Sequence, residues 1–154
     1  MNSYKKTTDI SYNDVNSRFM LTKPKLAEIL QQMAIEHSDT LGYNTEFLLE
    51  QNRGWIITNW HIIMDRTPLK GEKINFITWS EGMKRLMATR GFTAEDEKGE
   101  IIMRAASRWM FMDLEERKPV AVPKEMEEKY YSGLGYAIED EKYRLPKNEK
   151  QEPD

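Results

Sequence analysis

The chain has 154 residues, the size of one ordinary domain, and a chain of this length buries enough surface to form a sizeable core. Its 23 Lys and Arg are outnumbered by 26 Asp and Glu, for a net charge of -3, so there is no positive excess of the kind that binding DNA or RNA requires. The absence of cysteine excludes a disulfide scaffold, a cysteine-ligated zinc site and a cysteine nucleophile.

The start of the chain carries no targeting signal that we recognise. Residues 1–10 contain no apolar signal region, and no stretch approaches the ~20 apolar residues that a membrane span needs. We therefore expect a cytoplasmic protein without a membrane span, and the sequence points to no metal and no cofactor.

A strand and then a long helix are the first expected elements. Residues 7–14 predict the strand, and residues 21–43 predict the helix, with Thr22 as its cap, Pro24 in its first turn and Gly42 at its end. One face of the helix is apolar at helical spacing, which predicts that it packs on a broad surface; this stripe comprises Leu26, Ile29, Leu30, Met33, His37 and Leu41. Within the stripe, His37 is interpreted as a core histidine with satisfied ring nitrogens.

Four antiparallel strands follow a short second helix at residues 44–52. The strands are expected at residues 54–65, 72–80, 83–96 and 99–114, joined by turns that contain glycine. More than half of residues 137–154 are charged, which predicts a linker or tail. The order predicts an α+β fold, in which one domain at residues 4–130 wraps a curved sheet around the long helix and residues 131–154 form the tail.

The strand at residues 101–112 has one face that is almost entirely of core type. Ser107 lies on this face among apolar neighbours, so we interpret it as a hydrogen-bonded filler rather than a nucleophile. His61 shares a face with Asn59 and Asp65 at alternate positions, which makes it a candidate general base. The same face also holds Trp55 and Ile57 by this spacing, as a polar sheet edge or a subunit contact would, and both interpretations stay open.

Ten methionines and four tryptophans are a large number for a domain of this size. Such side chains suit the walls of a tunnel for a long apolar chain, and they fill ordinary cores equally well. A lipid ligand is therefore one of two open interpretations.

Several motifs, in order, resemble the first half of the acyl-acyl carrier protein (acyl-ACP) thioesterases. They are Q-x-x-A-x-x-H and L-G in residues 27–43, P-x-x-G before T-W in residues 55–79, and R-x-F with A-x-S-x-W-x-x-M-D-x-x-x-R-K-P in residues 90–123. The resemblance covers about residues 12–129. It implies two fused hotdog domains in the complete protein, each a curved antiparallel sheet around a long helix, and hydrolysis of the thioester between a fatty acyl chain and acyl carrier protein.

The resemblance also implies that the catalytic residues belong mainly to the second hotdog, where the family has a D-x-N-x-H-x-N-N stretch. Here Asp14 and Asn16 keep their places, but Arg18 replaces the histidine, and Met20 and Leu21 replace the two asparagines. Because a guanidinium stays protonated, Arg18 cannot accept a proton. We therefore expect an N-terminal, substrate-binding half without catalytic residues of its own, either a fragment or a stand-alone relative, and we expect it to associate with a second hotdog or with copies of itself.

The expected binding residues follow from the same resemblance. The acyl chain is expected between helix and sheet, and the acidic carrier protein on a basic rim. The expected acyl contacts are Met33, Trp60, Met64, Trp79 and Met110, and the expected docking residues are Lys84, Arg85, Arg117 and Lys118.

Two alternatives stay open. The first is a stand-alone hotdog that acts as a homodimeric acyl-CoA thioesterase or dehydratase, in which Glu46 or Glu50 serves as the base near His61 or Asn59. The second is a non-catalytic acyl-binding or scaffolding domain.

Overall fold

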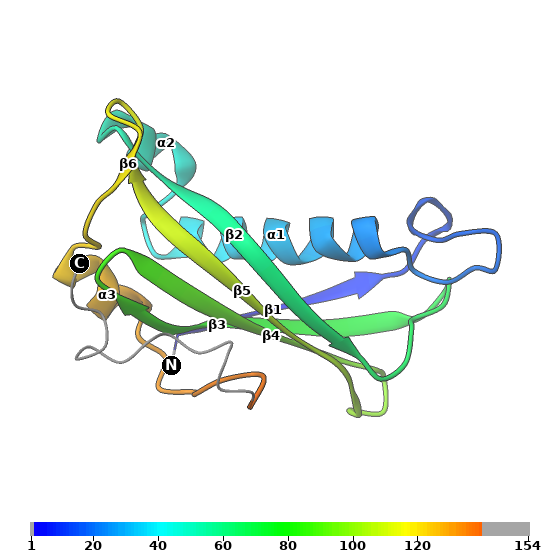
Figure 1. Cartoon of the computed structure of the whole chain (residues 1–154). Helices are drawn as coiled ribbons and strands as arrows, with labels where there is room; N and C mark the ends of the chain where they lie inside the picture. Colours follow the sequence, from blue (N-terminus) through cyan, green and yellow to red (C-terminus); the bar gives the residue numbers. More distant parts are fainter. Residues whose placement is uncertain (1, 140–154) are drawn as a thin grey trace.

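A curved antiparallel sheet holds one long helix in its concave face (Figure 1). The computed structural model describes residues 2–139. In chain order its elements are β1 (Ser3–Asp9), η1 (Tyr12–Asp14), α1 (Lys23–Thr40), α2 (Thr45–Glu50), β2 (Arg53–Met64), β3 (Lys73–Lys84), β4 (Met87–Glu95), β5 (Ile101–Asp113), β6 (Lys118–Pro119) and α3 (Lys124–Tyr130).

The strands form one sheet in the order β1-β3-β4-β5-β2, and every pair is antiparallel. The short β6 pairs with the last two residues of β5, past the point where the pairing of β5 with β4 ends. Strands β1 and β2 are thus the two edges of the path. The expected α+β architecture, with a curved sheet around one long helix, is confirmed.

Helix α1 forms where the sequence predicts it and is held by its apolar stripe. The Thr22 side chain accepts a hydrogen bond from the Lys25 backbone N–H, which caps the first turn. Leu30 and Met33 are almost fully buried, and they pack with Phe76 and Phe92 of the sheet in the main core cluster. Burying each such side chain contributes roughly 1.5–3 kcal/mol, so the stripe fixes the helix on the sheet.

Two strand boundaries differ from the sequence expectation. The first strand covers Ser3–Asp9 rather than residues 7–14, because Ser11 and Asp14 close a short 3-10 turn after it. Strand β3 continues to Lys84, because the register shifts by one residue at Glu81, a β-bulge, and Gly82 pairs with Thr89 instead of forming a turn. The turn into β4 comes later, with Arg85 at a φ of 59°.

A second β-bulge, at Thr58, reverses the faces of β2 along its length. Before the bulge, Trp55 and Ile57 stand opposite Phe111 and Trp109 and point to the helix side. After it, Trp60 is the inward residue, whereas Asn59 and His61 stand opposite Arg108 and Ala106 on the outer side. The expectation that Trp55 and Ile57 share a face with His61 is therefore wrong, because one inserted residue changes the alternation.

Residues 131–139 lie against the outer face of the sheet. Trp79 donates its indole N–H to the Gly135 carbonyl (2.9 Å), and Ser132 donates its hydroxyl to the Ser80 carbonyl (2.8 Å). Ile138 is buried there as well. The first part of the segment expected as a tail thus covers the sheet, while residues 140–154 lie outside the described part.

Candidate functional site

A cavity of about 320 Å³ lies between the C-terminal half of α1 and the end of the sheet that carries α2 and α3. Apolar side chains form most of its wall, as is typical of sites for small organic ligands. Of its 19 lining residues, nine are aliphatic, Met or Trp, and Tyr43 and Tyr130 add two aromatic rings. The nine are Ala34, Ile35, Leu48, Leu49, Trp55, Met83, Ala88, Trp109 and Leu114.

The cavity has an open side and a closed end. Gln31, Ile35, Thr45 and Leu49 are exposed residues of its wall, so it opens between the two helices and edge strand β2. At the closed end stands Arg90, opposite Ser107, whereas Gly54 at the other end stands opposite Met112. Ser107 and Met112 are five positions apart on β5, or about 16 Å at ~3.3 Å per residue.

Polar side chains meet at the closed end. Arg90 is 7% exposed, and its Nη1 donates to His37 Nδ1 (3.0 Å) and to Thr78 Oγ1 (3.2 Å). Beside it, the hydroxyls of Ser38 and Tyr130 share a hydrogen bond of 2.7 Å. This end therefore combines a buried cation with two hydroxyls.

Burial sets the protonation of these groups. It lowers the pKa of His37 to about 4, and the neighbouring Arg90 charge acts in the same direction, so the imidazole is neutral at pH 7. Because a guanidinium only donates, Nδ1 is the acceptor and the ring proton sits on Nε2. Burial also lowers the pKa of Arg90 to about 10 and raises the pKa of Tyr130. His37 is thus the core histidine that the helix pattern indicates.

The residues expected to contact an acyl chain lie outside the wall of this cavity. Met33 is 1% exposed in the main core cluster, and Trp60 and Met64 pack against that cluster. Trp79 lies on the outer face under residues 131–139, and Met110 stands opposite Ile56 and Met87 on the same face. Their role in binding stays a prediction.

His61, Asn59 and Glu50, the residues expected to act if this chain has a catalytic site of its own, do not converge. Asn59 and His61 do share the outer face of β2, but Asp65 pairs with Arg104 (3.7 Å) at the strand's end. Glu50 is the last residue of α2 and precedes the start of β2 at Arg53. His61 lies eight residues further along β2, about 26 Å from Arg53 at the rise of an extended strand. Ser107, by contrast, is buried and accepts the Trp109 indole N–H at 2.7 Å, as the filler interpretation predicts.

The loop at residues 14–21 is stabilised by its own polar side chains. The Asn16 side-chain oxygen accepts from the backbone N–H of Arg18 (2.8 Å) and of Met20 (3.1 Å), and Asp14 accepts from the Ser11 backbone. Arg18 is exposed, and Leu21 is part of the core. Asp14 and Asn16 therefore have a structural role here.

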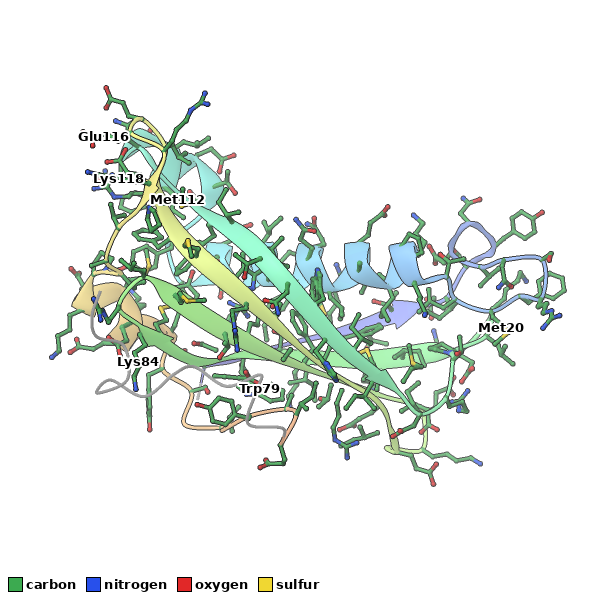
Figure 2. The ribbon with its side chains drawn as sticks, in the orientation of Figure 1. Met20, Trp79, Lys84, Met112, Glu116 and Lys118 are labelled. Carbon is green, nitrogen blue, oxygen red and sulfur yellow. The ribbon has the colours of Figure 1, made fainter. Side chains whose placement is uncertain are left out.

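The expected docking residues lie on two turns at one end of the sheet. Lys84 is the last residue of β3 and Arg85 begins the β3–β4 turn, while Arg117 precedes β6 and Lys118 begins it. Figure 2 shows Lys84 and Lys118 at the end opposite Met20, and Lys118 pairs with Glu116 at 3.1 Å. Docking of a carrier protein on them stays a prediction.

Sequence reasoning missed most of the cavity wall. Arg90 was visible only as the first residue of the R-x-F motif, and Tyr130 gave no functional signal. Trp55 and Trp109 are two of the four tryptophans that the composition suggested as tunnel walls, and both line the cavity. Within residues 2–139, no cluster of His, Asp and Glu could hold a metal ion. No helix in that range is long and apolar enough to cross a membrane.

The curved antiparallel sheet around one central helix is a hotdog fold, which the chain shares with solved acyl-ACP thioesterases. The chain belongs to the acyl-ACP thioesterase N-terminal domain family, whose model matches residues 1–130. A similar protein is oleoyl-acyl carrier protein thioesterase 1 of Arabidopsis thaliana, a chloroplastic protein, with 24% identity over 135 residues, which are 83% of this chain and 37% of the relative.

Two solved structures show the extent of the likeness. An acyl-ACP thioesterase from Bacteroides thetaiotaomicron VPI-5482 has a TM-score of 0.83 at 27% identity and covers 90% of this chain and 57% of its own. DHNA-CoA thioesterase from Staphylococcus aureus shares the fold, with a TM-score of 0.75 at 16% identity, over 84% of this chain and 89% of its own. The chain thus spans about one hotdog unit, and well under two thirds of the acyl-ACP thioesterases that it matches.

Proposed function

We propose that this chain is the acyl-binding half of an acyl-ACP thioesterase, which hydrolyses a fatty acyl thioester and releases the fatty acid. The observation that carries the proposal is the largely apolar cavity, whose open side lies between the helices and β2, while among residues 2–139 the expected catalytic side chains do not converge on a base. Family membership supports the chemistry. Location in the cytoplasm stays a prediction, since the Arabidopsis relative is chloroplastic.

The second part of the proposal is that another hotdog pairs with edge strand β2. The cavity lies at the start of β2, near Arg53, whereas the loop at residues 14–21 lies at the other end, where Leu21 N–H bonds Pro68 O and Met20 bridges Leu69. In a two-fold, antiparallel pairing of β2 with the corresponding strand of the partner, the start of one strand lies beside the end of the other. This pairing therefore sets the partner's corresponding loop beside this cavity, where a partner with a histidine in that loop supplies a base that Arg18 cannot provide.

Two alternatives are weaker. A homodimeric acyl-CoA thioesterase or dehydratase needs Glu46 or Glu50 beside His61, and Glu50 is separated from it by most of β2. In a homodimer the partner's loop brings another Arg18 and no histidine. A non-catalytic acyl-binding domain shares the same cavity and differs only in lacking a catalytic partner.

The test compares hydrolysis and binding by the purified chain, with acyl carrier protein loaded with a series of saturated acyl chains. We expect binding but turnover near background, because general-base assistance contributes ~10²–10⁴ in rate. The complete Bacteroides thetaiotaomicron enzyme serves as the positive control. Turnover of order 1 per second by the chain alone contradicts the missing base, and failure to bind any acyl chain contradicts the acyl-binding role.

A further inference from the structure

The closed end of the cavity holds an uncompensated positive charge. Arg90 lines the cavity and is 7% exposed. A guanidinium has five N–H donors, and those of Nη1 bond His37 and Thr78. In the described part of the chain, neither Nη2 nor Nε has a hydrogen-bond partner, and no carboxylate lies within salt-bridge distance.

Burying such a charge without a counter-ion is costly, and nearby protein groups do little to offset it. His37 is neutral, Thr78 is neutral, and the Tyr130 hydroxyl keeps its proton because burial raises its pKa. Removal from water also lowers the pKa of Arg90 to about 10. An anion that enters the cavity would restore electroneutrality at this position.

The neighbouring hydroxyls fit an acceptor at the same place. Ser38 and Tyr130 have two O–H groups and share one hydrogen bond, so one further O–H is available. Both residues line the cavity next to the apolar wall of Ala34, Met83 and Ala88. A ligand that matches this surface has an aliphatic body and a negatively charged acceptor at its buried end.

We propose that the cavity binds an aliphatic chain that carries a carboxylate at its buried end, with Arg90 as the partner of that carboxylate. The proposal rests on the acyl-binding role above and specifies the ligand class of the same cavity. A carboxylate is favoured over a hydroxyl because it neutralises the charge and accepts two parallel N–H bonds from one guanidinium.

Such a carboxylate has two possible sources. A released fatty acid presents one when it enters head first, and an acyl thioester presents one when its distal end is carboxylated. Octanoate stands for the first source and monomethyl octanedioate for the second, whereas 1-octanol has a similar body without the charge.

The experiment measures the affinity of the full chain for these three probes by titration calorimetry. We expect a carboxylate probe to bind roughly 10–100-fold more tightly than 1-octanol, as a charged hydrogen bond implies, and the stronger of the two carboxylates identifies the source. Arg90→Met should abolish this preference but keep the affinity for 1-octanol. Arg104→Met, an arginine on the opposite face of the same sheet, should retain the preference.

A second readout does not depend on whether Arg90→Met folds. With octanoate labelled with carbon-13 at the carboxyl, NMR should show that the bound carboxyl stays ionised to lower pH than the free acid, because Arg90 favours its charged form. Equal affinity for octanoate, the monoester and 1-octanol, or a preference that survives Arg90→Met, overturns the inference. Binding of 1-octanol alone overturns it while leaving the acyl-binding role intact, and binding of no probe overturns both.

Discussion

The His37 imidazole and the Arg90 guanidinium form a hydrogen bond that exists only while the imidazole is neutral. His37 is 2% exposed, and its ring also lies against Tyr4 and Tyr130, with centroids 6.0 and 6.1 Å away. Protonating Nδ1 would remove the acceptor and place two cations 3.0 Å apart in a buried position. The folded protein therefore resists protonation of this residue.

This resistance predicts a loss of stability in mild acid. The pKa of His37 is about 4 in the folded chain and ~6.5 in the unfolded chain, so only the unfolded state takes up the proton between these values. The contribution of neutral His37 to the free energy of unfolding is fully present above pH 6.5. It falls as the pH drops toward 4, by at most ~1.4 kcal/mol per pH unit. Urea denaturation at pH 7.0 to 5.0 measures this slope.

The comparison with variants isolates the effect from that of other groups. His37→Gln should be less stable at pH 7 but should lose most of the slope between pH 6.5 and 5. His61→Gln, at the other histidine of the chain, should keep it. An unchanged slope in His37→Gln would show that another group causes the acid sensitivity.

Gly91 on β4 is packed too closely against β3 to leave room for a side chain. A Cβ on Gly91 would lie 2.7 Å from Glu81 Oε2, closer than real contacts come, and 3.0 Å from the Trp79 ring, which is tighter than most real contacts. The Glu81 carboxylate in turn accepts from the Ala137 backbone N–H at 2.7 Å, and burial raises the pKa of this carboxyl. Gly91 thus lets the outer face of the sheet hold Trp79 and Glu81 under residues 131–139.

Gly91→Ala should therefore destabilise the fold by ~1–3 kcal/mol, because the Trp79 ring and the Glu81 carboxyl must both shift. The midpoint of urea denaturation measures the change. Glu81→Ala removes the closest atom, so the same glycine substitution should cost less in that background. Equal costs in the two backgrounds would show that Glu81 does not set the spacing.

At the level of elements, the sequence pattern predicted α1, α2 and the number of strands between α2 and residue 114, but it missed α3 and the exact faces of the strands. The stripe through Leu30 and Met33 was enough to place α1, since one helix face must meet the sheet. The bulges at Thr58 and Glu81 were not predicted, because an inserted residue has no signature in the alternation. The shifted β3–β4 register also hid Arg90, whose contact with His37 joins residues 53 positions apart.

At the scale of the whole molecule, the exposed edge of strand β2 is where we expect a second hotdog domain to bind. In the described residues its outer edge pairs with no other strand, and Ile56 and Ile63 on it are 48% and 38% exposed. A long edge with apolar side chains tends to pair with another chain. The expected domain boundary near residue 130 stays a prediction, although residues 131–139 cover the opposite, β3 side of the sheet through Trp79.

We expect the isolated chain to self-associate through β2, because no second hotdog covers this edge in a solution of the chain alone. Ile56→Lys with Ile63→Lys should weaken the association by roughly tenfold or more, since each isoleucine loses a burial worth ~1.5–3 kcal/mol. Sedimentation equilibrium measures the dissociation constant. Leu134→Lys is the matched control, because Leu134 is 41% exposed in the segment at residues 131–139, which lies on the β3 side of the sheet. A strict monomer, or equal weakening by the control, would place the contact elsewhere and remove the support for pairing at β2.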